Sequence, residues 1–224
     1  MENQELIDLY STSFPFWDNL NQYDRDTFVK SSQTVCFRGG TNIHDGGECT
    51  GVILVKSGSL RLYLLSDEGK EVTLYRLFPG DVCILSASCV LHTITFDVLI
   101  DAEEDSECYV INGCAFKDIT DRTPEIKIFT LETAVGRFSD VMWVMQQILF
   151  MSLDKRLAIF LLDEASRLGS DVIPLTHEQI ARYMGSAREV VSRMLKYFSA
   201  EGLVELSRKG VKIIDKQKLR SLIL

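Results

Sequence analysis

Residues 175–195 read LTHEQIARYMGSAREVVSRML, and this stretch decides the fold of the C-terminal part of the chain. Thr176 stands three residues before Gln179, which is the capping-box spacing at the start of a helix. Gly185 is expected to end that helix, and a second helix is predicted to begin around Ser186. Two short helices joined by a tight, glycine-containing turn are typical of a helix-turn-helix motif.

The second predicted helix has two unlike faces. At roughly 100° per residue, its polar side chains fill an arc of about 140°. These polar residues are Arg188, Glu189, Ser192, Arg193 and Lys196. The remaining circumference carries Val190, Val191, Met194, Leu195, Tyr197 and Phe198. We therefore expect the apolar face to pack against the protein and the polar face to meet a partner.

The residues that follow predict a wing. Gly202 is expected to end the second helix, and LVELSRKGVKII at 203–214 indicates a hairpin with its turn near Lys209 and Gly210. The charge is also uneven: from Leu153 onward there are 13 Lys and Arg against 9 Asp and Glu, whereas residues 1–152 hold 11 against 23. Although the formal net charge is −8, the C-terminal part would attract a polyanion. The acidic surface alternatively serves only solubility.

A helix-turn-helix places its second helix in the DNA major groove. There, Arg can donate to O6 and N7 of guanine, and Glu can accept from N4 of cytosine. Arg188, Glu189 and Arg193 are therefore predicted to read bases, while Ser192 and Lys196 contact bases or phosphates. The full candidate DNA-binding set is Thr176, Gln179, Arg188, Glu189, Ser192, Arg193 and Lys196.

Two other interpretations of this face stay open at this stage. Glu189 stands three residues after Ser186 and is alternatively a helix cap. The arginines are alternatively a solvated face, with Glu189 and Arg193 paired at i, i+4. The preceding helix, the wing and the local positive charge together favour DNA.

Upstream, residues 33–111 predict short antiparallel strands. The stretch GVILVKSGSLRLYLLSDEGKEVTLYRLFPGD at 51–81 alternates apolar and polar residues. Turns are expected at Gly58, at 67–69 and at Pro79-Gly80. Strands this short and this evenly spaced are typical of a barrel or sandwich.

A long helix is predicted to begin at Pro124, which suits a first helical turn. Its apolar residues recur at alternating steps of three and four, the pattern of a coiled-coil seam: Ile128, Leu131, Val135, Phe138, Met142, Met145 and Leu149. We favour self-association over an ordinary helix packed on its own barrel. A second amphipathic helix, 153–168, should end at Gly169. The predicted domains are residues 1–116, 117–152 and 153–224.

This arrangement resembles the cyclic-AMP receptor protein/fumarate–nitrate reductase regulator (Crp/Fnr) family over residues 15–215. The most specific match is LTHEQIARYMGSAREVVSRML, which contains REVVSR. The resemblance implies an α+β fold with an N-terminal double-stranded β-roll of the cyclic-nucleotide-binding type, a long dimerisation helix and a C-terminal winged helix-turn-helix. It implies a homodimer on a palindromic operator, with RNA polymerase as a further partner. Arg188 matches the cyclic-AMP branch and Ser192 the oxygen-sensing branch, so the half-site stays open.

The effector is predicted to be neither an iron–sulfur cluster nor cyclic AMP. No close-set cysteine group precedes Cys36, as the cluster-binding branch would require. The residues CILSASCVLH at 83–92 do not fit a zinc spacing, and no metal site is predicted. Buried structural cysteines are favoured there over a redox-active or haem-ligating or metal-ligating set. The candidate effector or redox residues are Cys83, Ser86, Cys89, His92, Val141 and Met142.

Cyclic AMP is disfavoured because this part of the roll lacks cationic side chains to hold its phosphate. The nucleotide-binding relatives use a Glu and an Arg-Ser pair, which by position are replaced near Leu85 and near Phe96-Asp97. From Leu77 through Phe116 the chain has no Lys or Arg but seven carboxylates. A buried phosphate without a cation is costly. We expect an uncharged or hydrophobic ligand or a response through Cys83 and Cys89; the alternative is that no effector binds.

Several other classes are disfavoured. The polar N-terminus shows no secretory signal and no apolar run is long enough for a membrane helix, which favours a cytoplasmic protein with six free thiols. The protein is not expected to be an enzyme, because the roll offers only His44 and His92 and no nucleophile elbow or phosphate loop. The alternative function is a cupin-like roll that binds a small molecule or metal and lacks DNA function.

Overall fold

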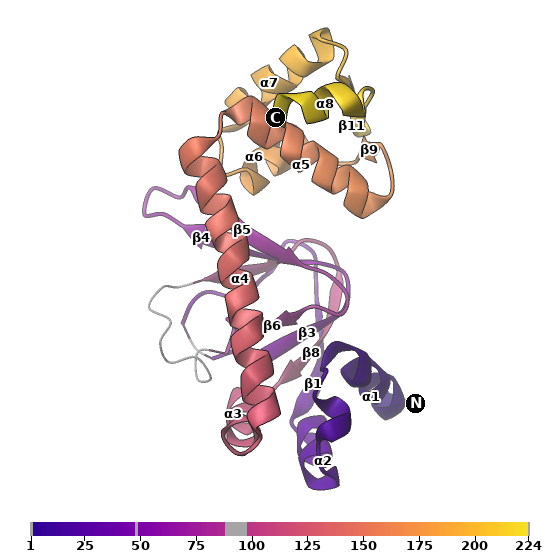
Figure 1. Cartoon of the computed structure of the whole chain (residues 1–224), viewed down its shortest axis with the longest axis vertical. Helices are drawn as coiled ribbons and strands as arrows, with labels where there is room; N and C mark the ends of the chain where they lie inside the picture. The colour runs from indigo at the N-terminus through magenta and orange to yellow at the C-terminus, as the bar shows by residue number, and fades with distance from the viewer. Residues whose placement is uncertain (1, 48, 88–97, 224) are drawn as a thin grey trace. The chain divides into compact units, whose positions relative to one another are not determined.

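The computed structural model describes residues 2–47, 49–87 and 98–223 and has an α+β fold (Figure 1). By their contacts the residues form two compact units, 1–64 with 74–141 and 65–73 with 142–224. The helices of the first unit and the long helix that follows it are α1 (Glu2–Ser13), the 3₁₀ turn η1 (Trp17–Asn19), α2 (Gln22–Lys30), α3 (Gly113–Arg122) and α4 (Pro124–Phe150). The strands are β1 (Ser32–Phe37), β2 (Asn42–His44), β3 (Val52–Ser57), β4 (Leu60–Leu65), β5 (Glu71–Leu77), β6 (Val82–Cys83), β7 (Leu99–Ala102) and β8 (Ser106–Ile111).

These strands form a β-roll, the architecture that the family resemblance implies. One sheet has the order β1-β8-β3-β6 and the other β2-β7-β4-β5. Side chains from both sheets meet in one buried cluster, which includes Ile53, Leu62, Ile100 and Cys108. Because both inner faces are apolar, the core lies between the two sheets.

The expected apolar–polar alternation is wrong for β3, whose first four residues are all buried. Ile53 and Val55 face the cluster between the sheets, whereas Val52 and Leu54 belong to a second cluster. That second cluster is rich in aromatic rings from the N-terminal helices, such as Phe14 and Phe28. Since helices cover the outer face of this sheet, both faces of β3 need apolar side chains.

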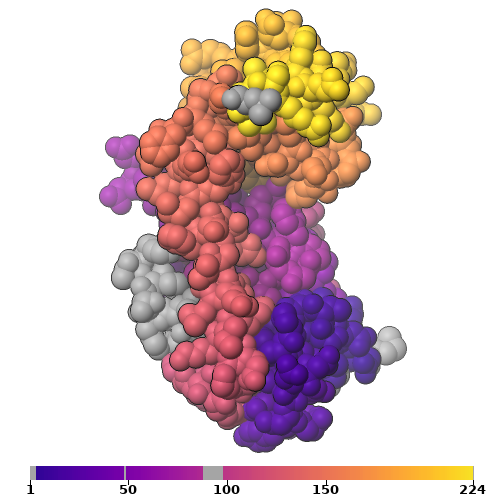
Figure 2. All heavy atoms as spheres, viewed as in Figure 1, coloured from indigo at the N-terminus to yellow at the C-terminus, as the bar shows by residue number. Residues whose placement is uncertain are grey.

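The helix α4 begins at Pro124, as predicted, and is the longest helix in Figure 1. Its inner face packs on the roll through residues such as Ile126, whereas the predicted seam is solvent-exposed. The exposed fractions along the seam are 55% for Ile128, 53% for Leu131, 65% for Val135, 64% for Phe138, 44% for Met142, 50% for Met145 and 59% for Leu149. In Figure 2, α4 lies at the visible surface. Among the described residues, no helix combines the length and apolarity needed to span a bilayer.

The C-terminal part has its own core and holds the predicted helix-turn-helix and wing. Its elements are α5 (Leu153–Leu168), β9 (Val172–Ile173), α6 (His177–Tyr183), α7 (Arg188–Ala200), β10 (Val204–Ser207), β11 (Gly210–Ile213) and α8 (Lys216–Ile223). Gly169 ends α5 in the left-handed conformation, as expected (φ 59°). The strands pair in the order β10-β11-β9. Leu157 and Leu161 of α5 share one buried cluster with α7 and the wing strands, so α7 is packed against both.

Candidate nucleic-acid interface

The first helix of the motif, α6, has the predicted capping box. The backbone N–H of Gln179 donates to Thr176 Oγ1 (3.2 Å), and the N–H of Thr176 donates to Gln179 Oε1 (2.8 Å). Both side chains therefore satisfy the start of α6. Tyr183, the last residue of α6, stacks on Phe160 of α5 with ring centroids 5.8 Å apart.

The second helix, α7, divides into the two predicted faces. Val191, Leu195 and Phe198 are fully buried. The polar residues Arg188, Glu189, Arg193 and Lys196 are exposed, and Ser192 is half-buried. The buried face thus anchors α7, and the charged side chains lie on its exposed face.

Two details of α7 differ from the prediction. Tyr197 was expected on the packed face but is 55% exposed. The buried residues of α7 centre near Val191, and Tyr197 lies at the margin of that face, about 120° around the helix at 100° per residue. The helix also begins later than expected, because Ala187 occupies the N-cap position and makes no side-chain cap.

Arg188 has a partner that the sequence analysis missed. Its Nη1 lies 3.4 Å from Oε2 of Glu178 on α6. In the part of the chain that the structure describes, no ion pair joins Glu189 to Arg193, so the i, i+4 alternative has no support. Glu178 reaches Arg188 across the turn between the helices, so this ion pair depends on how α6 packs against α7.

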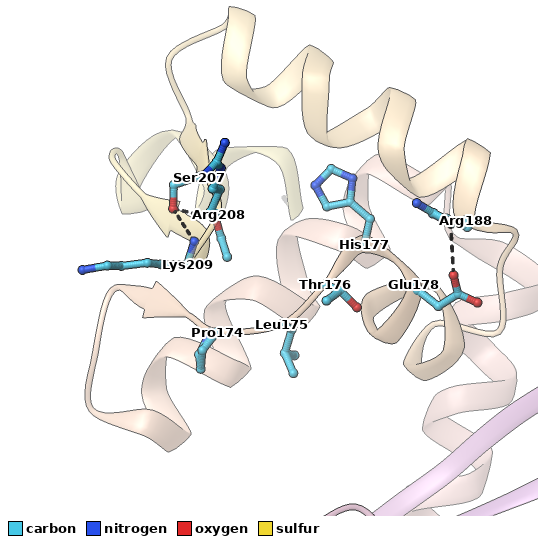
Figure 3. A pocket seen from close by; sticks show the side chains of 10 residues that line it. Pro174, Leu175, Thr176, His177, Glu178, Arg188, Ser207, Arg208 and Lys209 are labelled. Atoms are coloured by element: carbon cyan, nitrogen blue, oxygen red, sulfur yellow. Dashed lines mark hydrogen bonds and ion pairs between the residues drawn. The ribbon is translucent and has the colours of Figure 1, made fainter. Parts of the chain in front are cut away.

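Arg188 and the wing line one hollow of about 450 Å³. Figure 3 shows His177 between Arg188 and the wing residues, with the Arg188–Glu178 pair dashed. Its lining is Pro174, Leu175, Thr176, His177, Glu178, Arg188, Ser207, Arg208, Lys209 and Gly210. Three of these residues are cationic and one is acidic, so the hollow favours an anion.

His177 joins the two helices of the motif. Its Nδ1 lies 3.0 Å from Ser192 Oγ, a hydrogen bond between the first turn of α6 and the middle of α7. Desolvation lowers the pKa of His177, and the charges of Arg188 and Lys196 lower it further. The imidazole is therefore mostly neutral at pH 7. His177 is absent from the DNA-binding set predicted from the sequence.

In the roll, two of the candidate effector residues lie together, because the Ser86 hydroxyl donates to the carbonyl of Cys83 (3.3 Å). Cys83 is buried, and desolvation raises the pKa of its thiol, so little thiolate forms at neutral pH. Ser86 is also buried, and its hydroxyl donates to the carbonyl of Gly51 (2.6 Å). Val141 packs partly buried against the roll, whereas the neighbouring Met142 is exposed. Cys89, His92 and the Phe96-Asp97 pair lie outside the described residues.

The expectation of six free thiols is wrong for Cys49, which is disulfide-bonded. Cys36, Cys83, Cys108 and Cys114 are free. Composition alone does not specify which cysteines pair. Whether two sulfur atoms meet depends on how the chain folds.

Residues 77–116 contain no Lys or Arg, but some of their carboxylates have cationic partners from elsewhere in the chain. Arg76 Nε donates to Glu103 Oε2 (2.6 Å), and Arg137 of α4 lies 3.2 Å from Asp81. These arginines precede and follow residues 77–116, and the fold brings them to carboxylates inside that range. A count along the chain cannot detect such pairs.

Comparisons with known proteins identify the family. A model described as Crp-like helix-turn-helix domain matches residues 155–222, and one described as Cyclic nucleotide-binding domain matches residues 36–123. A solved structure from Eubacterium rectale, assigned to the crp/fnr family of transcriptional regulators, is 47% identical. It superposes with a TM-score of 0.88 over 94% of this chain and 98% of that one. The chain belongs to the Crp/Fnr family of transcription regulators.

More distant Crp/Fnr members align along most of the chain. The transcriptional activator protein FnrA of Stutzerimonas stutzeri is 26% identical, with 88% of this chain and 83% of that protein aligned. The probable transcriptional regulator flp of Lacticaseibacillus casei is 25% identical, with 92% and 94% aligned. The resemblance predicted from residues 175–195 is confirmed, and the protein is a DNA-binding transcription regulator of the Crp/Fnr type.

Proposed function

We propose that this Crp/Fnr regulator binds an inverted-repeat operator as a homodimer in the cytoplasm. The observation that carries the proposal is the polar face of α7, where Arg188, Glu189 and Arg193 are exposed beside a cationic hollow. Arg188 and Arg193 read guanine, and Glu189 accepts from cytosine. Ser192 and Lys196 contact bases or phosphates.

Thr176 and Gln179 have a different part in this proposal. Their side chains bond to one another's backbone, so they contribute by fixing the start of α6. Phosphate contacts by backbone groups and short polar side chains set the register of a protein on the duplex. We assign Thr176 and Gln179 to this positioning role.

Dimerisation is supported by the seam of α4. Seven apolar side chains at heptad spacing are exposed in the single chain. Trp143 and Ile148, which the seam prediction omitted, extend the exposed apolar surface. A surface of this kind on a soluble protein marks an interaction site. A second copy of α4 presents the same heptad pattern and is the occupant we propose.

Selection of binding sites from random duplexes tests the proposal. Enrichment of an inverted repeat is expected, with half-sites about 10 base pairs apart or a multiple of that spacing. A selected motif without two-fold symmetry would contradict homodimeric binding, and the absence of any enriched motif would contradict sequence-specific binding. Co-purification of RNA polymerase with the operator complex tests the proposed partner.

The roll is proposed to respond to an uncharged or hydrophobic ligand rather than to cyclic AMP. Leu85, Val141 and the buried Cys83 all belong to the apolar interior of the roll or pack against it. The guanidinium of Arg137 lies over the ring of Tyr75, 4.8 Å from its centroid, and pairs with Asp81. Arg137 is already paired with Asp81, so a nucleotide phosphate would have to displace the Asp81 carboxylate to bind this guanidinium.

A further inference from the structure

His177 lines the hollow, and its hydrogen bond to Ser192 uses only one of its two ring nitrogens. With Nδ1 engaged by Ser192 Oγ, the other ring nitrogen, Nε2, has no hydrogen-bond partner among the described residues. The residue is half-buried and lines the hollow with Arg188 and the wing. The ring therefore has one nitrogen held by the protein and one available to a ligand in the hollow.

The charged groups around His177 are mostly positive. From α7 they are Arg188 and Lys196, and from the wing they are Arg208 and Lys209. The one carboxylate that lines the hollow, Glu178, already pairs with Arg188. Desolvation, together with the charges of Arg188 and Lys196, holds the pKa of His177 down in the free protein. An incoming anion would offset their repulsion.

We propose that His177 is a DNA-contacting residue that donates from Nε2 to a backbone phosphate seated in this hollow, and that it takes up a proton when the duplex binds. The inference rests on the proposed DNA-binding function and adds a residue and a linked proton to it. The bond to Ser192 orients the ring. In the neutral ring the Ser192 hydroxyl donates to Nδ1, and in the protonated ring Nδ1–H donates to the hydroxyl oxygen, so both states keep the bond.

The sign of the pH dependence follows from this arrangement. A phosphate diester close to the imidazole raises the pKa of His177 in the complex above its lowered value in the free protein. Between those two values the complex holds one more proton per protomer than the free protein does. Affinity therefore rises as the pH falls through this range, by up to about tenfold per pH unit for each linked proton.

If His177 contacts a phosphate, the pH dependence of affinity should not vary with the DNA sequence. Phosphates are the same on every duplex, so the pH dependence should be equal for the selected operator and for random DNA. A histidine that reads a base would show the dependence only on the operator. This separates backbone contact from base recognition.

The test measures Kd for operator and random duplexes from pH 6 to 8 at fixed salt, for the wild type, His177→Gln and His177→Arg. The wild type should bind about three- to tenfold tighter at pH 6.5 than at pH 7.5. His177→Gln should lose this difference while remaining folded by circular dichroism. His177→Arg should also lose it and should bind more tightly than the wild type at pH 8, because its charge is permanent.

Calorimetry in two buffers of different ionisation enthalpy then counts the protons taken up on binding. Uptake in the wild type that disappears in both variants is the expected result. Equal pH dependence in all three proteins, or variants that change operator affinity alike at every pH, would overturn the inference and leave His177 a purely structural partner of Ser192. If the wild type binds no duplex at all, the proposed function itself fails.

Discussion

Replacing Met142 by Glu tests whether the seam of α4 joins two protomers. Met142 lies near the middle of the seam and is 44% exposed in the single chain. Full burial of a methionine is worth about 1.5–3 kcal/mol, so covering this exposed fraction contributes about 1 kcal/mol per protomer. Met142→Glu removes that contribution.

The introduced carboxylate adds a larger cost. To close the seam, the dimer must bury two carboxylates, and the least costly way is to protonate them. Protonating a Glu with an ordinary pKa at pH 7 costs about 3.7 kcal/mol. With the lost burial, the dimer is destabilised by about 9 kcal/mol, a roughly million-fold increase in its dissociation constant.

The Met142→Glu variant should partly regain dimerisation in acid. At pH 5 the protonation cost falls to about 1 kcal/mol per carboxyl, which restores about 5 kcal/mol to the dimer. The pKa of each introduced carboxyl is raised in the dimer relative to the monomer. Dimerisation of the variant therefore strengthens as the pH falls.

Light scattering on a size-exclusion column measures the outcome at micromolar protein. At pH 7 the variant should elute with the mass of one chain, 25.4 kDa, and should bind the operator far more weakly than the wild type. Gln147→Glu is the matched control, because it adds the same charge to α4 at a half-buried position opposite the seam. A Met142→Glu variant that stays dimeric at pH 7 would refute the seam, and a monomeric wild type would refute dimerisation altogether.

Three further outcomes test the interface, the effector and the wing. Arg193→Ala should cost about 1–3 kcal/mol on the best operator and relax specificity at one guanine, whereas Lys196→Ala should weaken binding to all duplexes alike; equal losses on operator and random DNA for Arg193→Ala would argue against base reading. Titration calorimetry with cyclic AMP should detect no binding, and a dissociation constant of about 10 μM or tighter, near −7 kcal/mol, would refute the negative prediction. Gly210→Ala should lower the free energy of unfolding more than Gly202→Ala. Both glycines have positive φ (117° and 72°), but a Cβ at Gly210 would lie 2.0 Å from the carbonyl oxygen of Ile173, whereas the space at Gly202 is open. Equal losses of unfolding free energy for the two variants in denaturant titrations would show that the close approach of Ile173 to Gly210 does not matter for stability.

Local sequence signals predicted several elements of the fold and of the candidate site well. The capping box of Thr176 and Gln179, the wing turn near Gly210 and the start of α4 at Pro124 all depend on residues within a few positions of one another. The faces of α7 follow in the same way from a helical period, with Tyr197 as the residue at the margin. Caps, turns and helix faces depend on residues close together in the chain, so they can be predicted without knowing the tertiary structure.

The amino-acid sequence alone therefore determined the helix-turn-helix, the wing, the run of short strands and the heptad pattern of α4. Only the tertiary structure decided which side chains meet across those elements. It paired Arg188 with Glu178, joined His177 to Ser192 and brought Arg76 to Glu103. The physical reason is that these partners are separated by 10 to 27 residues, so their contact depends on how whole elements pack, which no local pattern specifies.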